Sequence, residues 1–169
     1  MKEPGMECGI ALGSNSGDRL AHLQAAVTVL RGRDPALEVS PIYESAPVDC
    51  PAGSPAFYNA VAILHWRETP ESLLAFLRDT EARLGRPAVR TRNAQRNIDL
   101  DILYAGDAVR HSDSLTIPHP RMHLRRFVLQ PLCDLRPVLI LPGTDKTAAM
   151  LLAALPSGPP AVSRLDCAL

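Results

Sequence analysis

Residues 97–103 read Asn-Ile-Asp-Leu-Asp-Ile-Leu, and this alternation restricts the fold more than any other segment. Successive side chains of a β-strand point to opposite faces, so Ile98, Leu100 and Ile102 share one face while Asp99 and Asp101 share the other. The segment is therefore predicted to be a strand that buries its apolar face. Aspartate is uncommon in strands, and the acidic face needs an explanation of its own.

Asp99 and Asp101 are candidate metal ligands. Two carboxylates this close repel each other, and a fold tolerates them best where a cation balances their charge. Proteins bind Mg²⁺ through one or two carboxylates together with water and substrate phosphate oxygens, so Mg²⁺ is the predicted ion. The alternative is a solvent-exposed strand face on which the aspartates keep a sheet edge soluble.

Arginines are concentrated just before this strand. Arg86, Arg90, Arg92 and Arg96 fall within eleven positions, although the chain as a whole has a formal net charge of zero. Guanidinium groups stay charged and pair with phosphate oxygens through a planar fork. Arginines beside carboxylates therefore indicate a metal and phosphate site, whereas an isolated arginine is more often a solvated surface residue.

Strand and helix patterns alternate along the chain. Strand patterns lie at residues 8–12, 37–43, 57–64 and 98–104, the last followed by a turn at 106–107 into 108–111. Helical patterns lie at residues 20–30, 70–84, 122–132 and 148–155. Thr69 and Pro70 supply a capping hydroxyl and a first-turn proline for the second helix, and Gly85 supplies its stop. This order predicts an α+β sandwich with a partly antiparallel sheet.

The remaining composition is that of one soluble domain. The chain has 169 residues, of which 46% are apolar and 21% charged, as is typical of globular proteins. We expect a single domain over residues 1–169, with 1–7 and 156–169 peripheral. The four cysteines form no C-x-x-C pair, and neither a signal peptide nor a membrane-length apolar run is visible. These features favour a cytoplasmic protein with reduced thiols.

Two further segments are weaker candidates. Residues 13–17, Gly-Ser-Asn-Ser-Gly, match neither phosphate-binding glycine motif, and a turn before a helix cap is the simpler interpretation, although Asn15 could line a pocket. His119 and His123 are four positions apart, but Pro120 argues against a helical metal pair. His119 could present its ring to a phosphate or be an ordinary turn residue.

Several motifs occur in an order that is more specific than any one of them. They are Ala11-Leu12-Gly13-Ser14-Asn15, Tyr58-Asn59-Ala60-Val61, Glu81 followed by Gly85-Arg86, Arg96-Asn97-Ile98-Asp99-Leu100-Asp101-Ile102-Leu103, Ile117-Pro118-His119-Pro120-Arg121-Met122, Arg125, and Phe127-Val128-Leu129-Gln130-Pro131-Leu132. Together they resemble the 6-hydroxymethyl-7,8-dihydropterin pyrophosphokinases of folate biosynthesis, over nearly the whole chain.

The resemblance implies a ferredoxin-like α/β sandwich with a mostly antiparallel sheet flanked by helices. It also implies a reaction in which the hydroxymethyl oxygen of the pterin attacks the β-phosphorus of ATP, with two Mg²⁺ ions bound, and AMP leaves. The implied partners are ATP and 6-hydroxymethyl-7,8-dihydropterin, with no nucleic acid and no membrane, and a monomer is expected.

The resemblance also assigns roles by position. The implied catalytic residues are Asp99 and Asp101, which hold the metal ions, and Arg86 and Arg96, which belong to a mobile loop that closes over the triphosphate. Around the nucleotide it places Glu81, Arg86, Arg96, Ile102, Thr116, His119 and Arg125. Around the pterin it places the stacking rings of Phe57 and Phe127, and it places Ser45, Ala46, Val48 and Asn59 at the hydrogen-bonding edge.

The chain departs from this family at a few positions. Asn93-Ala94-Gln95 stands where many members have Trp-Gly-Pro, which leaves open how a closed loop would exclude water. Pro120 and Asn97 replace a common aromatic residue and a common threonine. The alternative hypothesis is a non-catalytic nucleotide- or nucleic-acid-binding module on the same fold. Zero net charge and only seven aromatic residues argue against it, since single-strand binders use aromatic platforms in a basic groove.

Overall fold

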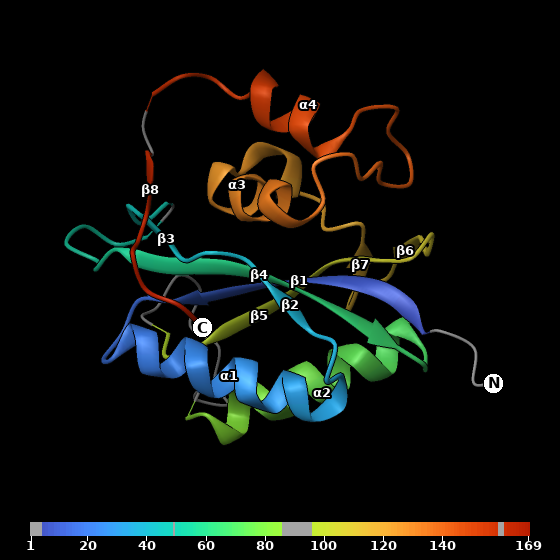
Figure 1. The fold of residues 1–169 in the computed structure, drawn as a ribbon, viewed down its shortest axis with the longest axis horizontal. Helices are drawn as coiled ribbons and strands as arrows, with labels where there is room; N and C mark the ends of the chain where they lie inside the picture. The colour runs from blue at the N-terminus through green and yellow to red at the C-terminus, as the bar shows by residue number, and fades with distance from the viewer. Residues whose placement is uncertain (1–4, 49, 86–95, 159–160) are drawn as a thin grey trace.

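The computed structural model describes residues 5–48, 50–85, 96–158 and 161–169, which form three layers (Figure 1). The strands are β1 (Met6–Ser14), β2 (Glu38–Val39), β3 (Tyr43–Ser45), β4 (Phe57–Trp66), β5 (Asp99–Ala105), β6 (Arg110–His111), β7 (Thr116–Ile117) and β8 (Val162–Arg164). The helices are α1 (Arg19–Arg33), α2 (Pro70–Arg83), α3 (Arg126–Leu135), α4 (Ala148–Ala154) and a 3₁₀ turn at Met122–Leu124.

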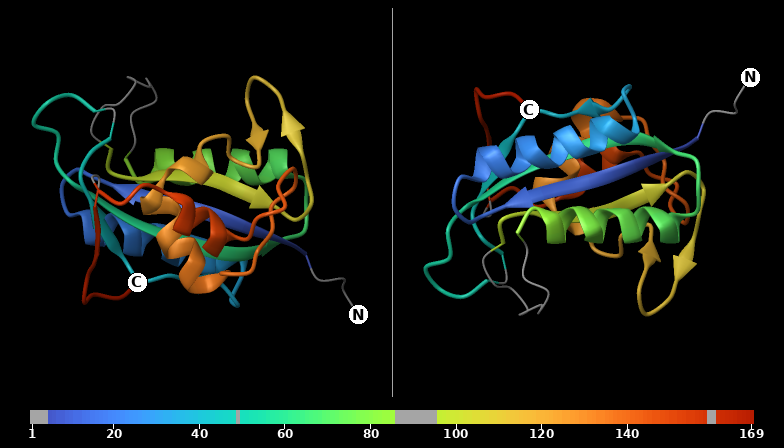
Figure 2. Two further views of the ribbon diagram at one scale, coloured as in Figure 1. Left: turned by 90° about the horizontal axis from the view of Figure 1, so that it is seen from above. Right: turned by 90° about the horizontal axis from the view of Figure 1, so that it is seen from below.

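The middle layer is a sheet with the strand order β5-β1-β4-β3-β8, and β2 pairs with another part of β4. Helices α1 and α2 cover one face, and α3 and α4 lie over the other (Figures 1 and 2). Every strand pair among the described residues is antiparallel. The predicted α+β sandwich with an antiparallel sheet is thus confirmed.

The ends of the first two helices follow from side-chain caps. The Asp18 carboxylate accepts a hydrogen bond from the N–H of Ala21 at 3.0 Å, and the Thr69 hydroxyl accepts one from the N–H of Ser72 at 3.2 Å. Gly85 follows α2 at φ +88°, a backbone conformation that glycine adopts without strain. The first helix was expected to end before Gly32, but it continues to Arg33.

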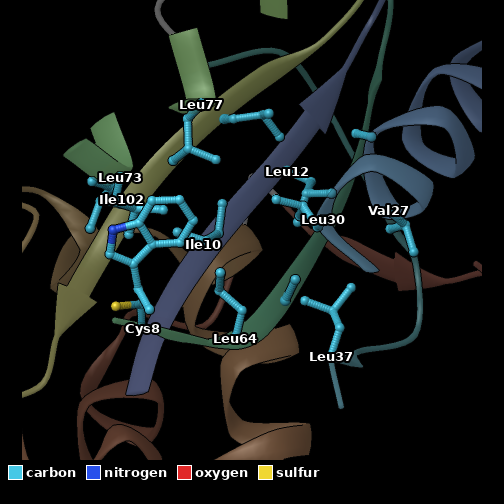
Figure 3. Packing of buried hydrophobic residues seen from close by; sticks show 14 of the residues in the cluster. Cys8, Ile10, Leu12, Val27, Leu30, Leu37, Leu64, Leu73, Leu77 and Ile102 are labelled. Carbon is cyan, nitrogen blue, oxygen red and sulfur yellow. The ribbon is translucent and has the colours of Figure 1, made fainter. Parts of the chain in front are cut away.

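The larger core lies between the sheet and the helices α1 and α2 (Figure 3). Apolar side chains recur along both helices at helical spacing, and they meet the strand residues Ile10 and Leu12. The helix residues in this cluster include Leu23, Val27, Leu30, Leu73 and Leu77, all at most 1% exposed. Burying each large side chain contributes about 1.5–3 kcal/mol, so this face holds α1 and α2 to the sheet.

A β-bulge turns β5 toward the opposite face. Ile10 pairs with Ile102 and Gly9 pairs with Tyr104, so Leu103 is an extra residue on β5. Leu103 and Tyr104 are consequently both packed in the cluster beneath α3. The Tyr104 ring lies over Gly9, and its hydroxyl donates to the Glu7 carboxylate at 2.7 Å.

Two predicted elements are interrupted. Residues 37–43 form β2 and only the start of β3, because Pro41 has no N–H for the ladder. Ser40, just before it, exchanges two hydrogen bonds with Val61, through its backbone N–H and its hydroxyl oxygen, each 2.9 Å long. The helix predicted at 122–132 is split because Arg125 is extended at φ −119° and ψ 104°, so a 3₁₀ turn precedes α3.

Other segments lie where the sequence did not place them. The turn at 106–107 leads into β6, which pairs with β7 in a separate two-stranded sheet rather than continuing the main one. Residues 1–7 and 156–169 were expected to be peripheral, but β1 begins at Met6 and β8 pairs with β3. Among the described residues, no helix combines the length and the apolar character that a membrane span requires.

Candidate active site

The predicted metal and pterin residues meet in one row across the sheet. Asp99 of β5 pairs with Gly13 of β1, Gly13 pairs with Asn59 of β4, and Asn59 pairs with Tyr43 of β3. Neighbouring strands lie about 4.8 Å apart, so the backbones at Asp99 and Asn59 are separated by roughly 10 Å. That span matches the size of a small planar ring with a reactive substituent.

Gly13 places no side chain in the middle of this row. A Cβ atom added there would lie 3.7 Å from Cδ1 of Phe57 and 3.8 Å from Oδ1 of Asn59, at van der Waals contact distance. Any side chain at this position would therefore pack against two of the predicted pterin residues. Only the backbone of Gly13 lies between the paired residues Asp99 and Asn59.

Leu100 and Ile102 pack in the core on the side of α1 and α2, so the alternation along β5 directs Asp99 and Asp101 to the other face of the sheet, over which α3 lies. The Arg96 guanidinium forms an ion pair with the Asp99 carboxylate, and their side chains are 26% and 18% exposed. Asp101, two residues further on, is half-buried. A cationic group and two carboxylates therefore share one partly shielded position, which is the combination expected for a metal and phosphate site.

Asn15 fixes the backbone of Arg96. Its side-chain oxygen accepts a hydrogen bond from the N–H of Arg96 at 2.8 Å, and its own N–H donates to the carbonyl of Arg96 at 3.1 Å. Asn15 is 1% exposed, so both bonds are shielded from water. The sequence suggested that Asn15 could line a pocket, and its observed contact fixes Arg96, three residues before β5 begins.

His119 lies beside the same acidic group as a neutral ring. The backbone N–H of His119 donates to the Leu103 carbonyl at 2.8 Å, and the ring Nδ1 accepts from the backbone N–H of Arg121 at 3.2 Å. Burial, together with the charges of Arg125 and Arg121, lowers the pKa of His119 to about 4, although Asp99 opposes the shift. With Nδ1 accepting a hydrogen bond, the proton of the neutral ring is on Nε2, which is thereby a hydrogen-bond donor.

The other end of the row carries the predicted pterin residues. The Asn59 amide donates to the Ser45 hydroxyl at 2.8 Å and to the Tyr43 carbonyl at 3.4 Å, and both Asn59 and Ser45 are buried. The Tyr43 hydroxyl donates to Asp134 of α3 at 2.7 Å, and burial together with this carboxylate raises its pKa. The polar edge of Asn59 is thus held in one orientation.

Phe57 and Phe127, the predicted stacking rings, are both half-buried. Phe57 precedes Asn59 on β4, whereas Phe127 is in the first turn of α3. The Arg125 guanidinium lies 5.5 Å from the centre of the Phe127 ring, so one face of that ring is next to a cation. Ala46 and Val48 follow β3 and are exposed.

Comparison with known proteins identifies the family. A sequence model of the family described as 7,8-dihydro-6-hydroxymethylpterin-pyrophosphokinase (HPPK) matches residues 9–137. The chain belongs to the HPPK family. The match includes the acidic strand, the Asn15 segment, His119 and Phe127, so the resemblance seen in the sequence is confirmed.

Individual HPPK relatives agree with this assignment. The 2-amino-4-hydroxy-6-hydroxymethyldihydropteridine pyrophosphokinase of Pseudomonas aeruginosa is 40% identical over 150 residues, which cover 87% of this chain and 90% of that protein. The enzyme of the same name from Haemophilus influenzae is 36% identical over 138 residues, 80% of this chain and 85% of that protein. The folic acid synthesis protein fol1 of Schizosaccharomyces pombe is 37% identical over 88% of this chain, which spans only 20% of that longer protein.

The fold is shared with solved HPPK structures. The crystal structure of wild-type Plasmodium falciparum HPPK-DHPS has a TM-score of 0.69 and 14% identity, covering 90% of this chain and 45% of that one. At this identity the likeness shows the fold alone.

Two residues predicted to lie around the nucleotide have side chains that make contacts within the fold. Glu81 of α2 is buried, and its carboxylate accepts a hydrogen bond from the N–H of Leu100 at 2.8 Å. The Ile102 side chain lies in the core beneath α1 and α2. Glu81 therefore supports β5 from the far face, and only the backbone of Ile102 could face a nucleotide.

Two further residues predicted to lie around the nucleotide are Thr116 and Arg86. Thr116 is half-buried on β7, where it pairs with His111. Arg86 belongs to residues 86–95, which lie outside the described part of the chain, as does the Asn93-Ala94-Gln95 segment. Sequence reasoning did not assign Gly13 or Tyr43 to the site, although the pairing of their strands places them in its central row.

Proposed function

We propose that this chain transfers the diphosphate of ATP to the hydroxymethyl group of 6-hydroxymethyl-7,8-dihydropterin and releases AMP. The observation that carries the proposal is the row in which Asp99 lies beside Arg96 at one end and Asn59 lies at the other, with Gly13 between them. Membership of the HPPK family supports the same chemistry. The proposal takes the chain to act in the cytoplasm as a monomer.

The acidic strand fits Mg²⁺ through its donor set. Asp99 and Asp101 offer carboxylate oxygens on one face, which are the ligands that this ion prefers. The described residues contain no group of three or more His, Cys, Asp or Glu that could enclose an ion. An ion held here would take its remaining ligands from water and phosphate, so it would bind together with ATP. Two bound Mg²⁺ ions would neutralise phosphate charge and make the β-phosphorus more electrophilic.

The cationic and neutral donors of the site would hold the polyphosphate. The planar guanidinium of Arg96 can donate two hydrogen bonds to anionic oxygens and remains charged. Arg86 is proposed to do the same from the preceding segment. His119 would donate from Nε2 without adding charge, because its pKa of about 4 keeps the ring neutral near pH 7. Arg125 lies close enough to His119 to lower its pKa, so it adds positive charge on the same side.

The pterin would be recognised by stacking and by its polar edge. Phe57 and Phe127 supply flat apolar surfaces, and offset stacking favours a planar heterocycle between them. Asn59 presents an amide whose orientation is fixed by Ser45, so it can pair with a ring of defined donor and acceptor pattern. The position over Gly13 would bring the hydroxymethyl group toward Asp99.

In the proposed step the pterin hydroxyl oxygen forms a bond to the β-phosphorus of ATP. The bond between that phosphorus and the oxygen bridging to the α-phosphorus breaks, and AMP leaves with the bonding electrons. The hydroxyl proton is released to solvent, so the products are the pterin diphosphate, AMP and a proton. Residues that hold both reactants in line supply much of the rate.

The test is product identity. Purified protein with Mg²⁺, ATP and the dihydropterin should release AMP in equal amount to the pterin diphosphate, and omission of either the pterin or Mg²⁺ should abolish this release. ADP as the nucleotide product would contradict the proposal. A salt-dependent shift with RNA and no AMP release would favour the non-catalytic binding module instead.

A further inference from the structure

The C-terminal segment returns to the sheet beside the proposed pterin site. Strand β8 pairs with β3 so that Val162 faces Ser45 and Arg164 faces Tyr43. The N–H of Leu165 extends the pairing by donating to the Ile42 carbonyl at 2.9 Å. Figure 1 shows β8 beside β3 at the edge of the sheet. Strand β8 thus occupies the edge that β3 would otherwise expose.

The residues after β8 fix the segment to the far side of the sheet. Leu165, Cys167 and Leu169 pack against the core between the sheet and α1. The carbonyls of Ala168 and Leu169 lie 3.5 Å from side-chain donors of Gln24 and Arg31, both on α1. The C-terminal end accordingly lies next to α1 in Figure 1. Strand β8 is therefore held both by its backbone pairing with β3 and by the apolar packing of the residues that follow it.

Strand β3 depends on such support because it has only three residues. A strand this short forms few hydrogen bonds, and one neighbour alone holds it weakly. Ser45, its last residue, accepts the hydrogen bond from Asn59 and is followed by Ala46 and Val48. Any shift of β3 along its edge would therefore move three of the predicted pterin residues.

The start of β4, the strand that carries Asn59, is held by the Arg19 side chain. Arg19 of α1 donates to the Ala56 carbonyl at 2.8 Å and to the Glu44 carboxylate at 3.1 Å, and its guanidinium lies 3.8 Å from the centre of the Tyr58 ring. These contacts fix the start of β4. They touch β3 only through the half-exposed Glu44 side chain. Besides the Tyr43 hydroxyl bond to Asp134 of α3, the backbone of β3 is held by its pairing with β4 and β8.

We propose that β8 is a positioning strand for pterin binding, which holds β3 so that Ser45 keeps the Asn59 amide in its binding orientation. The inference rests on the proposed function, because it concerns the affinity of the same site for its pterin substrate. The nucleotide end of the row, at Asp99, lies on β5 at the opposite edge of the sheet. Loosening β8 should therefore weaken pterin binding and leave nucleotide binding unchanged.

A matched pair of proline variants tests this proposal. In an antiparallel pair the N–H groups of alternate residues point toward the partner, so Ser163 faces β3 as Leu165 does, and Arg164 faces outward. Ser163→Pro removes an inward N–H, whereas Arg164→Pro places the same ring where an edge strand tolerates it. Deletion of residues 161–169 is the third variant.

Binding is measured by calorimetry in two steps. The first titrates Mg²⁺ and α,β-methylene-ATP, and the second titrates 6-hydroxymethylpterin into the nucleotide complex. We expect Ser163→Pro and the deletion to raise the pterin Kd about tenfold or more, and Arg164→Pro to change it by less than about twofold. The nucleotide Kd should stay within about twofold for every variant that folds.

Each other outcome is decisive. An unchanged pterin Kd in Ser163→Pro would overturn the positioning role. An equal loss of nucleotide and pterin affinity would also overturn it, since that pattern reports general destabilisation. Absence of pterin binding by the unaltered protein would instead refute the proposed function. If the deletion variant does not fold, the two proline variants still separate these results.

Discussion

Asn15 and Arg96 are joined by two hydrogen bonds, one from each backbone N–H, with the Asn15 side chain and the Arg96 carbonyl as acceptors. This contact ties the end of β1 to the residue that precedes the acidic strand. Because Arg96 also pairs with Asp99, Asn15 indirectly sets where a guanidinium meets a carboxylate. A buried amide thereby positions a charge that the proposed reaction uses.

Asn15→Ala is expected to lower kcat by about 10- to 100-fold, because small displacements of a catalytic group are costly. It leaves the N–H of Arg96 without its buried acceptor, which destabilises the fold by about 1–3 kcal/mol. Asn15→Asp retains an oxygen acceptor at the same position and should recover most of the activity. Steady-state AMP release and urea denaturation measure the two effects; equal kcat in both variants would disprove the positioning role.

Asp99→Ala and Asp101→Ala should each lower turnover by about 100-fold or more, since a metal clamp supplies several kcal/mol of transition-state stabilisation. Both side chains are only partly buried, so the proteins should fold. Asp107→Ala, which removes an exposed carboxylate from the turn after β5, is the control and should retain activity. Near-normal turnover in either strand variant would remove that residue from the mechanism.

The acidic strand could be predicted from sequence because its signal is local. Alternation over residues 97–103 fixes which side chains share a face without any knowledge of neighbouring strands. The same holds for α2, where Thr69 and Gly85 mark the ends. The contact between Asn15 and Arg96 joins residues 81 positions apart, and it depends on which strand lies beside which. No periodicity contains that information.

For residues whose roles came from the family resemblance, the sequence did not predict every contact that the structure shows. Asp99 and Asn59 lie at the two ends of one row of paired strand residues, and the roles assigned to them and to His119 stay predictions. Glu81 bonds to a backbone N–H of β5, a role that only the docking of α2 reveals. Strand β8 was missed because the proline- and glycine-rich residues 156–160 indicate a peripheral tail, while its pairing with β3 is a tertiary effect.

His119 should make stability depend on pH in a defined direction. Its pKa is about 4 in the fold and 6.5 in the unfolded chain, so between these values the unfolded chain binds more protons. The stability contributed by the neutral ring is complete above pH 6.5 and falls as the pH drops toward 4. His119→Asn should therefore lose less thermal stability than the unaltered protein between about pH 7.5 and about pH 5.

The control for this comparison is His111→Asn, which removes an exposed histidine from β6. This variant should show the same pH dependence as the unaltered protein. Differential scanning calorimetry measures the Tm of the unaltered protein and of both variants at each pH, which gives the loss of Tm of each protein between the two pH values. An identical loss of Tm in His119→Asn and His111→Asn would show that the ring at 119 titrates normally.

Two glycine substitutions should change stability in opposite directions. A Cβ atom at Gly9 would lie 2.3 Å from Cε1 of Tyr104, and that ring cannot retreat because it is 2% exposed and bonded to Glu7. Gly9→Ala should therefore destabilise the protein by about 1–3 kcal/mol through overpacking. Gly32 lies within α1 with no atom within 4 Å of an added Cβ, so Gly32→Ala should stabilise it by about 0.5–1 kcal/mol. Urea denaturation compares the two variants, and a stable Gly9→Ala protein would mean that the Tyr104 ring does not lie over β1.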